Sequence, residues 1–267
     1  MDLLSFWEYD FMRNALWAIL LLVPLLSLLG TLVVNNGMSF FSDALGHSAL
    51  TGVAIGIVAG VAQYEWVMVA FAVVFALLMN RIRHSHIAST DTVIGVFSSV
   101  GVALGLLLLS RSSHFANYQS LLIGDVLSIT SEELWLVGGV LAAAVLVWLL
   151  CFNAFHAISI HPAVARNKGI PVRLLDDMFV VIVAVVVMLA IRWVGLLRIN
   201  AMLVLPAAAA RNVSRSMRSF TVLSLVFGVF AGVVGLLFSW YNAVATGPMI
   251  ILILATLFFG TFAMRRK

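Results

Sequence analysis

Long apolar runs separated by short polar breaks dominate the chain. The hydrocarbon core of a bilayer is about 30 Å thick and needs about 20 helical residues per crossing. The pattern therefore predicts an all-α, polytopic integral membrane protein with eight or nine transmembrane helices. The seventh run is short and ends in a Pro-Ala stretch, so both counts stay open. The predicted spans are about 14–34, 44–61, 66–80, 92–110, 133–152, 174–194, 196–210, 220–240 and 248–264.

Composition agrees with this pattern. The 267 residues are 63% apolar and only 10% charged, whereas soluble domains are about 45–50% apolar and about 25% charged. Soluble enzymes, nucleic-acid binders and secreted disulfide scaffolds are excluded as classes. The only cysteine, Cys151, cannot form an intrachain disulfide. No stretch is long and polar enough for an extramembrane domain, so residues 1–267 are predicted to form a single transmembrane domain.

Basic residues indicate the orientation. If the chain crosses nine times, four breaks fall on one side and together hold 11 of the 15 Lys and Arg residues. Cytoplasmic loops are enriched in Lys and Arg, so we expect the N-terminus outside and the C-terminus in the cytoplasm. The four clusters are Arg81 with Arg83; Arg166, Lys168 and Arg173; Arg211, Arg215 and Arg218; and Arg265, Arg266 and Lys267.

Two breaks are longer than a turn. Residues 111–132 are external in this topology and partly apolar, which favours a re-entrant or surface-lying segment. Residues 153–173 are internal and basic. Within them Pro162 can open a short helix, and Gly169 followed by Pro171 can close it. Such a helix, in a protein with little cytoplasmic mass, indicates a docking element.

The most informative polar pair inside a predicted span is Asp43 and His47. At positions i and i+4 of a helix, the two side chains share one face. A carboxylate and an imidazole are common ligands of zinc, manganese or ferrous iron. Two alternatives stay open: the side chains pair only with each other, or Asp43 caps the helix. Small residues follow at helical spacing, which allows close helix packing or a narrow path.

Other polar residues have plainer explanations. Asp91 precedes a second span with small residues, and a helix cap is favoured over a transport role. His84 and His86 do not share a helix face, which favours a solvated loop. Arg198 flanks the turn before the seventh span, where snorkelling to the interface is the alternative to a gate. The chain contains no G-x-x-x-x-G-K-[ST] motif. Energy for active transport would therefore come from a partner or from an ion gradient.

Five segments, in order, resemble the membrane permease subunits of ABC importers for zinc, manganese and ferrous iron. Most like this family are the residues from Met38 to Gly52, which contain Asp43-Ala-Leu-Gly-His47. The other similar segments are Asp91-Thr-Val-Ile-Gly95, 124–130, 194–210 with Pro206 in the Pro-Ala run, and Thr246-Gly247-Pro248. Departures are Asn35-Asn36 where arginines are common, His161-Pro162-Ala163 before the short helix, and Arg198 and Asn200 before the Pro-Ala run.

The resemblance implies a transport subunit without enzymatic activity, in the bacterial cytoplasmic (inner) membrane. It implies a cytoplasmic ATPase subunit that binds ATP, an extracytoplasmic metal-binding protein and a second permease copy. It carries over Asp43 and His47 as contacts of the transported metal. Beyond the carry-over, Asp91, Arg198, Asn200 and Pro206 are candidates for a gate or path. It also makes the helix at about 160–171 the coupling helix, with His161, Pro162, Ala165, Arg166 and Gly169 facing the ATPase.

Zinc is favoured over manganese or ferrous iron on general similarity in 124–130 and 159–165, and no permanently bound cofactor is expected. Two rival functions remain. An ion-coupled secondary carrier would use Asp43 and Asp91 as relay groups, but only a faint internal repeat supports it. A membrane scaffold without transport activity would leave the Asp43–His47 pair without a role.

Overall fold

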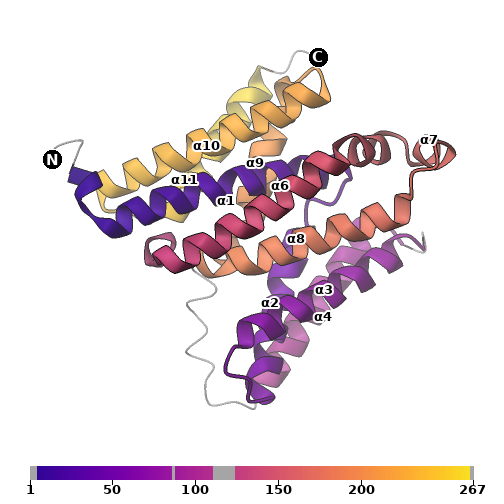
Figure 1. The fold of residues 1–267 in the computed structure, drawn as a ribbon, viewed down its shortest axis with the longest axis horizontal. Helices are drawn as coiled ribbons and strands as arrows, with labels where there is room; N and C mark the ends of the chain where they lie inside the picture. The colour runs from indigo at the N-terminus through magenta and orange to yellow at the C-terminus, as the bar shows by residue number, and fades with distance from the viewer. Residues whose placement is uncertain (1–4, 86–87, 111–123, 265–267) are drawn as a thin grey trace. The chain divides into compact units, whose positions relative to one another are not determined.

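The structure is a computed structural model that describes residues 5–85, 88–110 and 124–264, and in these ranges every regular element is helical (Figure 1). Eight of the described helices are long and apolar enough to cross a membrane. The prediction of an all-α polytopic membrane protein is therefore confirmed. The eight are α1 (Asp10–Asn35), α2 (Phe41–Val58), α3 (Tyr64–Arg83), α4 (Thr90–Leu109), α6 (Ser131–Ile160), α8 (Val172–Val194), α10 (Met217–Asn242) and α11 (Thr246–Ala263).

The remaining helices are shorter or more polar. The predicted seventh span forms α9 (Leu196–Val213), which continues through Pro206 and is not among the eight. Short helices are η1 (Ser5–Glu8), η3 (Val126–Ser128) and α7 (Pro162–Asn167). Most of the predicted surface segment 111–132 lies outside the described residues. Helix α6 extends to Ile160, beyond the predicted end at 152, and includes polar residues that we had assigned to the break.

Two compact units divide the chain, and both are discontinuous in sequence. The first consists of Met1–Asn35, Asp125–Phe152 and Ala201–Lys267, and the second of Asn36–Gly124 and Asn153–Asn200. The single-domain organisation stays a prediction. Asp43, His47 and the short helix α7 all belong to the second unit, which therefore contains most of the predicted functional residues.

Close helix packing builds the first unit, in which α10 runs beside α1 and α11 (Figure 1). A Cβ atom at Gly232 would lie 2.6 Å from the Cγ2 atom of Ile19, so only glycine lets α1 and α10 approach this closely. The Ser224 hydroxyl donates to the carbonyl of Ser27 over 3.1 Å across the same contact. Small residues at such crossings let backbones meet, which is the usual basis of helix association in membranes.

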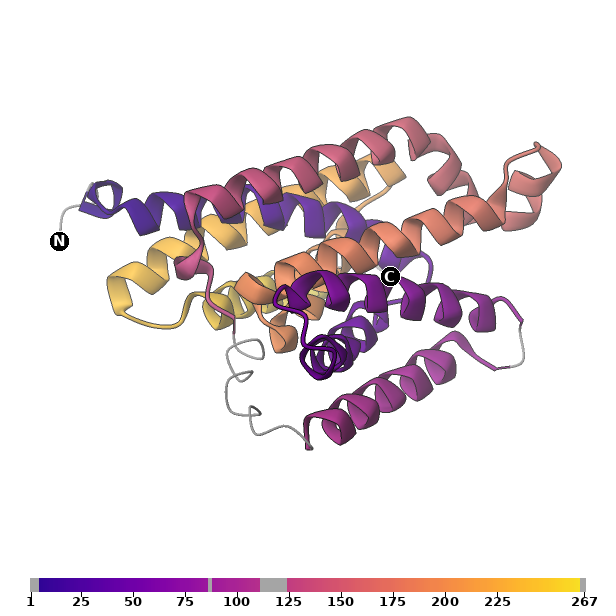
Figure 2. The same ribbon diagram turned by 60° about the horizontal axis from the view of Figure 1, so that its bottom comes forward.

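Small residues also build the second unit, where α2 packs against α3 and α4 (Figure 2). A Cβ atom at Gly52 would lie 2.7 Å from the Cα atom of Met68 in α3, and one at Gly105 would lie 3.0 Å from Leu50 in α2. The hydroxyl of Thr51 donates to the carbonyl of Gly101 in α4. The close packing expected of the small residues after His47 is therefore confirmed.

Candidate functional site

The Asp43 and His47 side chains lie together on the first half of α2. The Nε2 atom of His47 is 3.5 Å from the Oδ2 atom of Asp43, and the side chains are 28% and 39% exposed, respectively. Pairing along one helix face is confirmed. The capping alternative for Asp43 is wrong, because Phe40 occupies the N-cap position and no side chain caps the helix. The pair stays partly exposed, so a ligand can reach it from outside the helix.

The beginning of α9 packs beside this pair. The buried Ser42, next to Asp43, donates its hydroxyl proton to the Oδ1 atom of Asn200 over 2.6 Å. One turn further along α2, a Cβ atom at Gly46 would contact the side chain of Leu196 at 3.4 Å. The structure therefore brings Asn200, a predicted path residue, onto the turn of α2 that carries Asp43.

Arg198 contacts the segment around Gly124 at the same end of α9. Its guanidinium donates to the carbonyl of Gly124 over 3.1 Å. Gly124 has a φ of +60°, and a Cβ atom there would lie 2.2 Å from the backbone nitrogen of Gly195, so the two glycines pack backbone against backbone. Arg198 therefore contacts protein rather than only the membrane interface, as snorkelling alone would have it.

Two further predicted path residues lie elsewhere. Asp91 is exposed in the first turn of α4, where a carboxylate interacts favourably with the helix dipole. It is not the helix cap that we expected, because Ser89 holds that position and accepts from the backbone N–H of Thr92. Pro206 is buried within α9 in the first unit.

The pair offers one oxygen and one nitrogen ligand. In the described part of the chain, no group of three or more His, Cys, Asp and Glu side chains is arranged to hold a metal ion. A closed structural site uses four protein ligands, whereas a transport path needs contacts weak enough to release the ion. Two partly exposed ligands on a helix suit brief contact with a passing divalent cation.

Helix α7 has the features predicted for the docking helix. It begins at Pro162, with His161 as the exposed N-cap residue, and is a short helix between α6 and α8 (Figure 2). Gly169, at a φ of +76°, donates to the carbonyl of Arg166 and ends the helix. Ala165 is buried and Arg166 is exposed. The proline and the glycine thus delimit a short helix, as predicted. It covers Pro162–Asn167 rather than about 160–171, because α6 continues to Ile160 and α8 begins at Val172.

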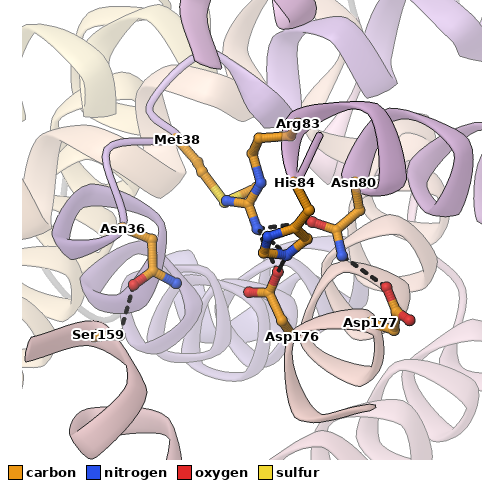
Figure 3. Close-up of polar contacts among 8 residues, drawn as sticks. All are labelled: Asn36, Met38, Asn80, Arg83, His84, Ser159, Asp176 and Asp177. Atoms are coloured by element: carbon orange, nitrogen blue, oxygen red, sulfur yellow. Dashed lines mark hydrogen bonds and ion pairs between the residues drawn. The ribbon is translucent and has the colours of Figure 1, made fainter. Parts of the chain in front are cut away.

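A polar cluster that the sequence did not indicate joins the end of α3 to the beginning of α8 (Figure 3). Asp176 is only 6% exposed; it accepts from the guanidinium of Arg83 and lies 2.6 Å from the Nε2 atom of His84. The fully buried Asn80 accepts from Arg83 and donates to Asp177, each over 2.7 Å. His84, interpreted as part of a solvated loop, in fact contacts a buried carboxylate.

The cluster reaches two more segments. Arg83 also donates to the sulfur of the buried Met38, in the connection between α1 and α2. Two residues earlier, Asn36 accepts from the hydroxyl of Ser159 near the end of α6 over 2.6 Å (Figure 3). The positively charged guanidinium of Arg83, in the middle of the cluster, repels metal cations. The cluster is therefore an ion-paired contact between helices rather than a metal site.

Together, the eight long apolar helices define a polytopic membrane protein. The chain belongs to the ABC 3 transport family, whose model matches residues 8–265. It is therefore a metal-ion ABC permease and an integral membrane protein, which confirms the resemblance noted in the sequence.

Individual relatives cover nearly the whole chain. An uncharacterised membrane protein of Synechocystis sp. is 31% identical over 97% of this chain and 92% of its own length. The manganese import system permease protein ScaB of Streptococcus parasanguinis is 28% identical over the same shares, 97% and 92%. Among solved structures, PsaBC from Streptococcus pneumoniae in complex with Fab matches with a TM-score of 0.84 and 29% identity, covering 98% of this chain and 95% of that one.

Proposed function

We propose that this chain is the permease subunit of an ATP-driven importer that carries manganese across the bacterial cytoplasmic membrane. The observation that carries the proposal is the Asp43–His47 pair on α2, inside a chain that matches metal permeases along its whole length. Asp43 and His47 make transient contacts with the ion, which is the substrate. Asn200 and Arg198 hold the neighbouring turn of α9 and line the path, while Asp91 and Pro206 are further candidates for a gate.

Manganese replaces zinc as the preferred ion. The sequence favoured zinc on general similarity alone, whereas a close relative is named as a manganese import permease. Carboxylate oxygen suits the harder Mn²⁺, and imidazole serves several first-row metals. Cys151, the only cysteine, lies on α6 and belongs to the first unit, whereas the pair belongs to the second. Such a site also accepts zinc or ferrous iron. Selectivity for manganese therefore depends on which metal the extracytoplasmic binding protein delivers, as well as on the path through the permease.

A separate cytoplasmic ATPase supplies the energy in this proposal. Helix α7 presents His161, Arg166 and Gly169 at an exposed surface, with Ala165 packed inward and Pro162 at its first position. A short, rigidly ended helix can sit in a groove of a partner and move as a body. ATP binding then moves α7, and the permease itself binds no ATP and performs no covalent chemistry.

The remaining partners complete the importer. An extracytoplasmic metal-binding protein delivers the ion, and a second permease copy supplies further ligands, because two protein ligands leave most of the coordination sphere of a divalent ion unfilled. Residues 1–267 act as one permease domain in the lipid bilayer. In the proposed topology α9 is a ninth crossing, so that the N-terminus lies outside and the C-terminus lies in the cytoplasm on the side of the basic clusters.

The test is metal uptake by proteoliposomes that contain the permease, its ATPase and the binding protein, with ATP enclosed or omitted. We expect uptake of ⁵⁴Mn²⁺ that requires ATP and exceeds uptake of ⁶⁵Zn²⁺. Asp43→Asn and His47→Gln should each reduce uptake at least tenfold while the complex still assembles. Glu65→Gln, a carboxylate change at the exposed start of α3, is the matched control and should keep at least half of the uptake.

Two outcomes would contradict the proposal. Uptake that follows a pH gradient, ignores ATP and is lost in both Asp43→Asn and Asp91→Asn would indicate the secondary carrier. Normal uptake by Asp43→Asn or His47→Gln would remove these residues from the path. Preferential zinc uptake by the wild-type complex would restore zinc as the cargo.

A further inference from the structure

In the second unit, the cluster around Arg83 has contacts toward two elements. These are helix α7, the proposed docking helix, and helix α2, which carries Asp43 and His47. On one side, helix α7 leads into α8 through only four residues, Lys168 to Pro171. That connection is stiff, because the backbone N–H of Ile170 donates to Ala165, Gly169 donates to Arg166, and Pro171 follows directly. A displacement of α7 is therefore passed to the beginning of α8, where Asp176 lies.

Asp176 passes the displacement to α3. Its carboxylate is almost completely buried and is shared by Arg83 and His84, which are adjacent at the end of α3. Charge-assisted hydrogen bonds from a guanidinium are stronger and more directional than neutral ones. A buried ion pair is costly to separate, because each partner would be left uncompensated. The ends of α8 and α3 therefore move together rather than slide past each other.

Arg83 extends the connection to α2. The side chain of the fully buried Met38 accepts from the same guanidinium, and the carbonyl of Met38 accepts from the backbone N–H of Phe41 over 2.9 Å at the first residue of α2. Asp43 follows within the next turn. Contacts thus run from α7 through the stiff connection to α8, and then through Asp176, Arg83 and Met38 to the helix that carries Asp43 and His47. Figure 3 shows the central part of this run, from Asp176 through Arg83 to Met38.

We propose that Arg83 and Asp176 are positioning residues that couple ATPase-driven movement of α7 to the Asp43–His47 pair on α2. The Arg83–Asp176 ion pair is the point at which four segments join: the α1–α2 connection, the end of α3, the beginning of α8 and, through α8, helix α7. Neither residue touches the transported metal. This inference rests on the proposed function.

The side chains beside the ion pair serve as matched controls. Arg81 is two residues from Arg83 and exposed, and Asp177 is adjacent to Asp176 and half-buried. Both line a polar depression of about 350 Å³ beside the cluster rather than its centre. Asp177→Asn keeps a carbonyl oxygen that can accept from Asn80, so it changes the same charge without breaking the ion pair.

The experiment measures metal uptake and ATP hydrolysis together in the reconstituted importer. We expect Arg83→Gln and Asp176→Asn to keep at least half of the ATP hydrolysis and to reduce the manganese taken up per ATP at least fivefold. Arg83→Lys, which keeps the charge but loses the planar fork, should lie between wild type and Arg83→Gln. Arg81→Gln and Asp177→Asn should stay within twofold of the wild-type ratio.

An unchanged ratio in Arg83→Gln and Asp176→Asn overturns the proposal, as does an equal loss in the two controls. A parallel fall of uptake and hydrolysis also overturns it, because a structural defect would lower both. If Arg83→Gln does not assemble, Asp176→Asn and His84→Gln are judged by the same ratio. If none of the three assembles, the cluster serves folding alone and the proposal is wrong. Failure of wild-type uptake would instead refute the proposed function.

Discussion

Adding one methyl group at Gly52 tests whether close backbone contact holds α2 against α3. In the structure, a Cβ atom at this position lies 2.7 Å from the Cα atom of Met68, and 3.3 Å from the Cβ and Cγ atoms of the same residue. Carbon atoms are in optimal contact at about 3.5–4.0 Å. Gly52→Ala therefore requires α2 and α3 to separate locally by about 1 Å, since the nearest obstacle is backbone and cannot rotate away.

The expected cost follows from two opposing terms. Overpacking of a well-packed core costs about 1–3 kcal/mol, while replacing glycine by alanine in a helix gains up to about 1 kcal/mol. Gly95→Ala in α4 is the matched control, because nothing lies within 4 Å of its Cβ position. The helix-propensity gain is common to both variants, so the difference between them isolates the packing cost of about 1–3 kcal/mol.

Thermal unfolding of the purified protein in detergent provides the measurement. A change of 1 kcal/mol shifts the Tm of a 150–250-residue domain by about 2–4 °C. We therefore expect the Tm of Gly52→Ala to lie at least about 2 °C below that of Gly95→Ala. Equal Tm values, or a more stable Gly52→Ala, would refute the packing argument, because the two helices would then have room that the structure does not provide.

Three further substitutions test local contacts. Ser216→Ala removes the hydroxyl that caps α10 by accepting from the N–H of Ser219, and should cost about 1 kcal/mol in thermal unfolding. Asn200→Ala leaves the hydroxyl of the buried Ser42 without its acceptor and should cost about 1–3 kcal/mol by the same measurement. Gly169→Ala forces a side chain into the left-handed region at a cost of about 1–2 kcal/mol, and in a binding titration should weaken ATPase binding about fivefold or more.

Each of these has a control in the same chain. Thr256→Ala removes an exposed hydroxyl that caps no helix and should leave the Tm unchanged. Asn200→Asp keeps the acceptor for Ser42, so a loss as large as that of Asn200→Ala would contradict the hydrogen-bond argument. Gly138→Ala adds a methyl group where nothing lies within 4 Å, on a helix of negative φ, and should not change ATPase binding. Normal ATPase binding by Gly169→Ala would mean that the shape of α7 does not matter for docking.

Local signals predicted the elements well. Apolar length located the eight long apolar helices, although it also predicted a span at α9, which is not among them. Pro162 and Gly169 located α7, because each acts on the adjacent turn of helix. The i, i+4 spacing of Asp43 and His47 correctly placed both side chains on one face of α2. The error at the end of α6 has a physical cause. Polar residues near the end of a span can continue the helix when a partner is present, as Asn36 is for Ser159.

Contacts between distant residues could not be predicted in this way. Arg83 and Asp176 are 93 residues apart, and each alone resembles an ordinary charge at the end of a span. Likewise, Asn200 looked like a departure from the family pattern, and only the structure places it against Ser42. The position of a cap is equally hard to predict. Ser89 directly precedes α4 and Asp91 lies two residues later in its first turn, and this shift decides which side chain reaches the free N–H groups.

The 93-residue separation of Arg83 and Asp176 also has a consequence for biogenesis. A ribosome releases α3 long before α8, so Arg83 enters the membrane boundary without the carboxylate that later neutralises it. Until then, the cost of burying an unpaired cation keeps this end of α3 in water, where a positive charge helps to retain a loop in the cytoplasm. Arrival of α8 then draws the same side chain inward. In the proposed topology, Arg83 would thus act first as a topology signal and afterwards as the buried partner of Asp176.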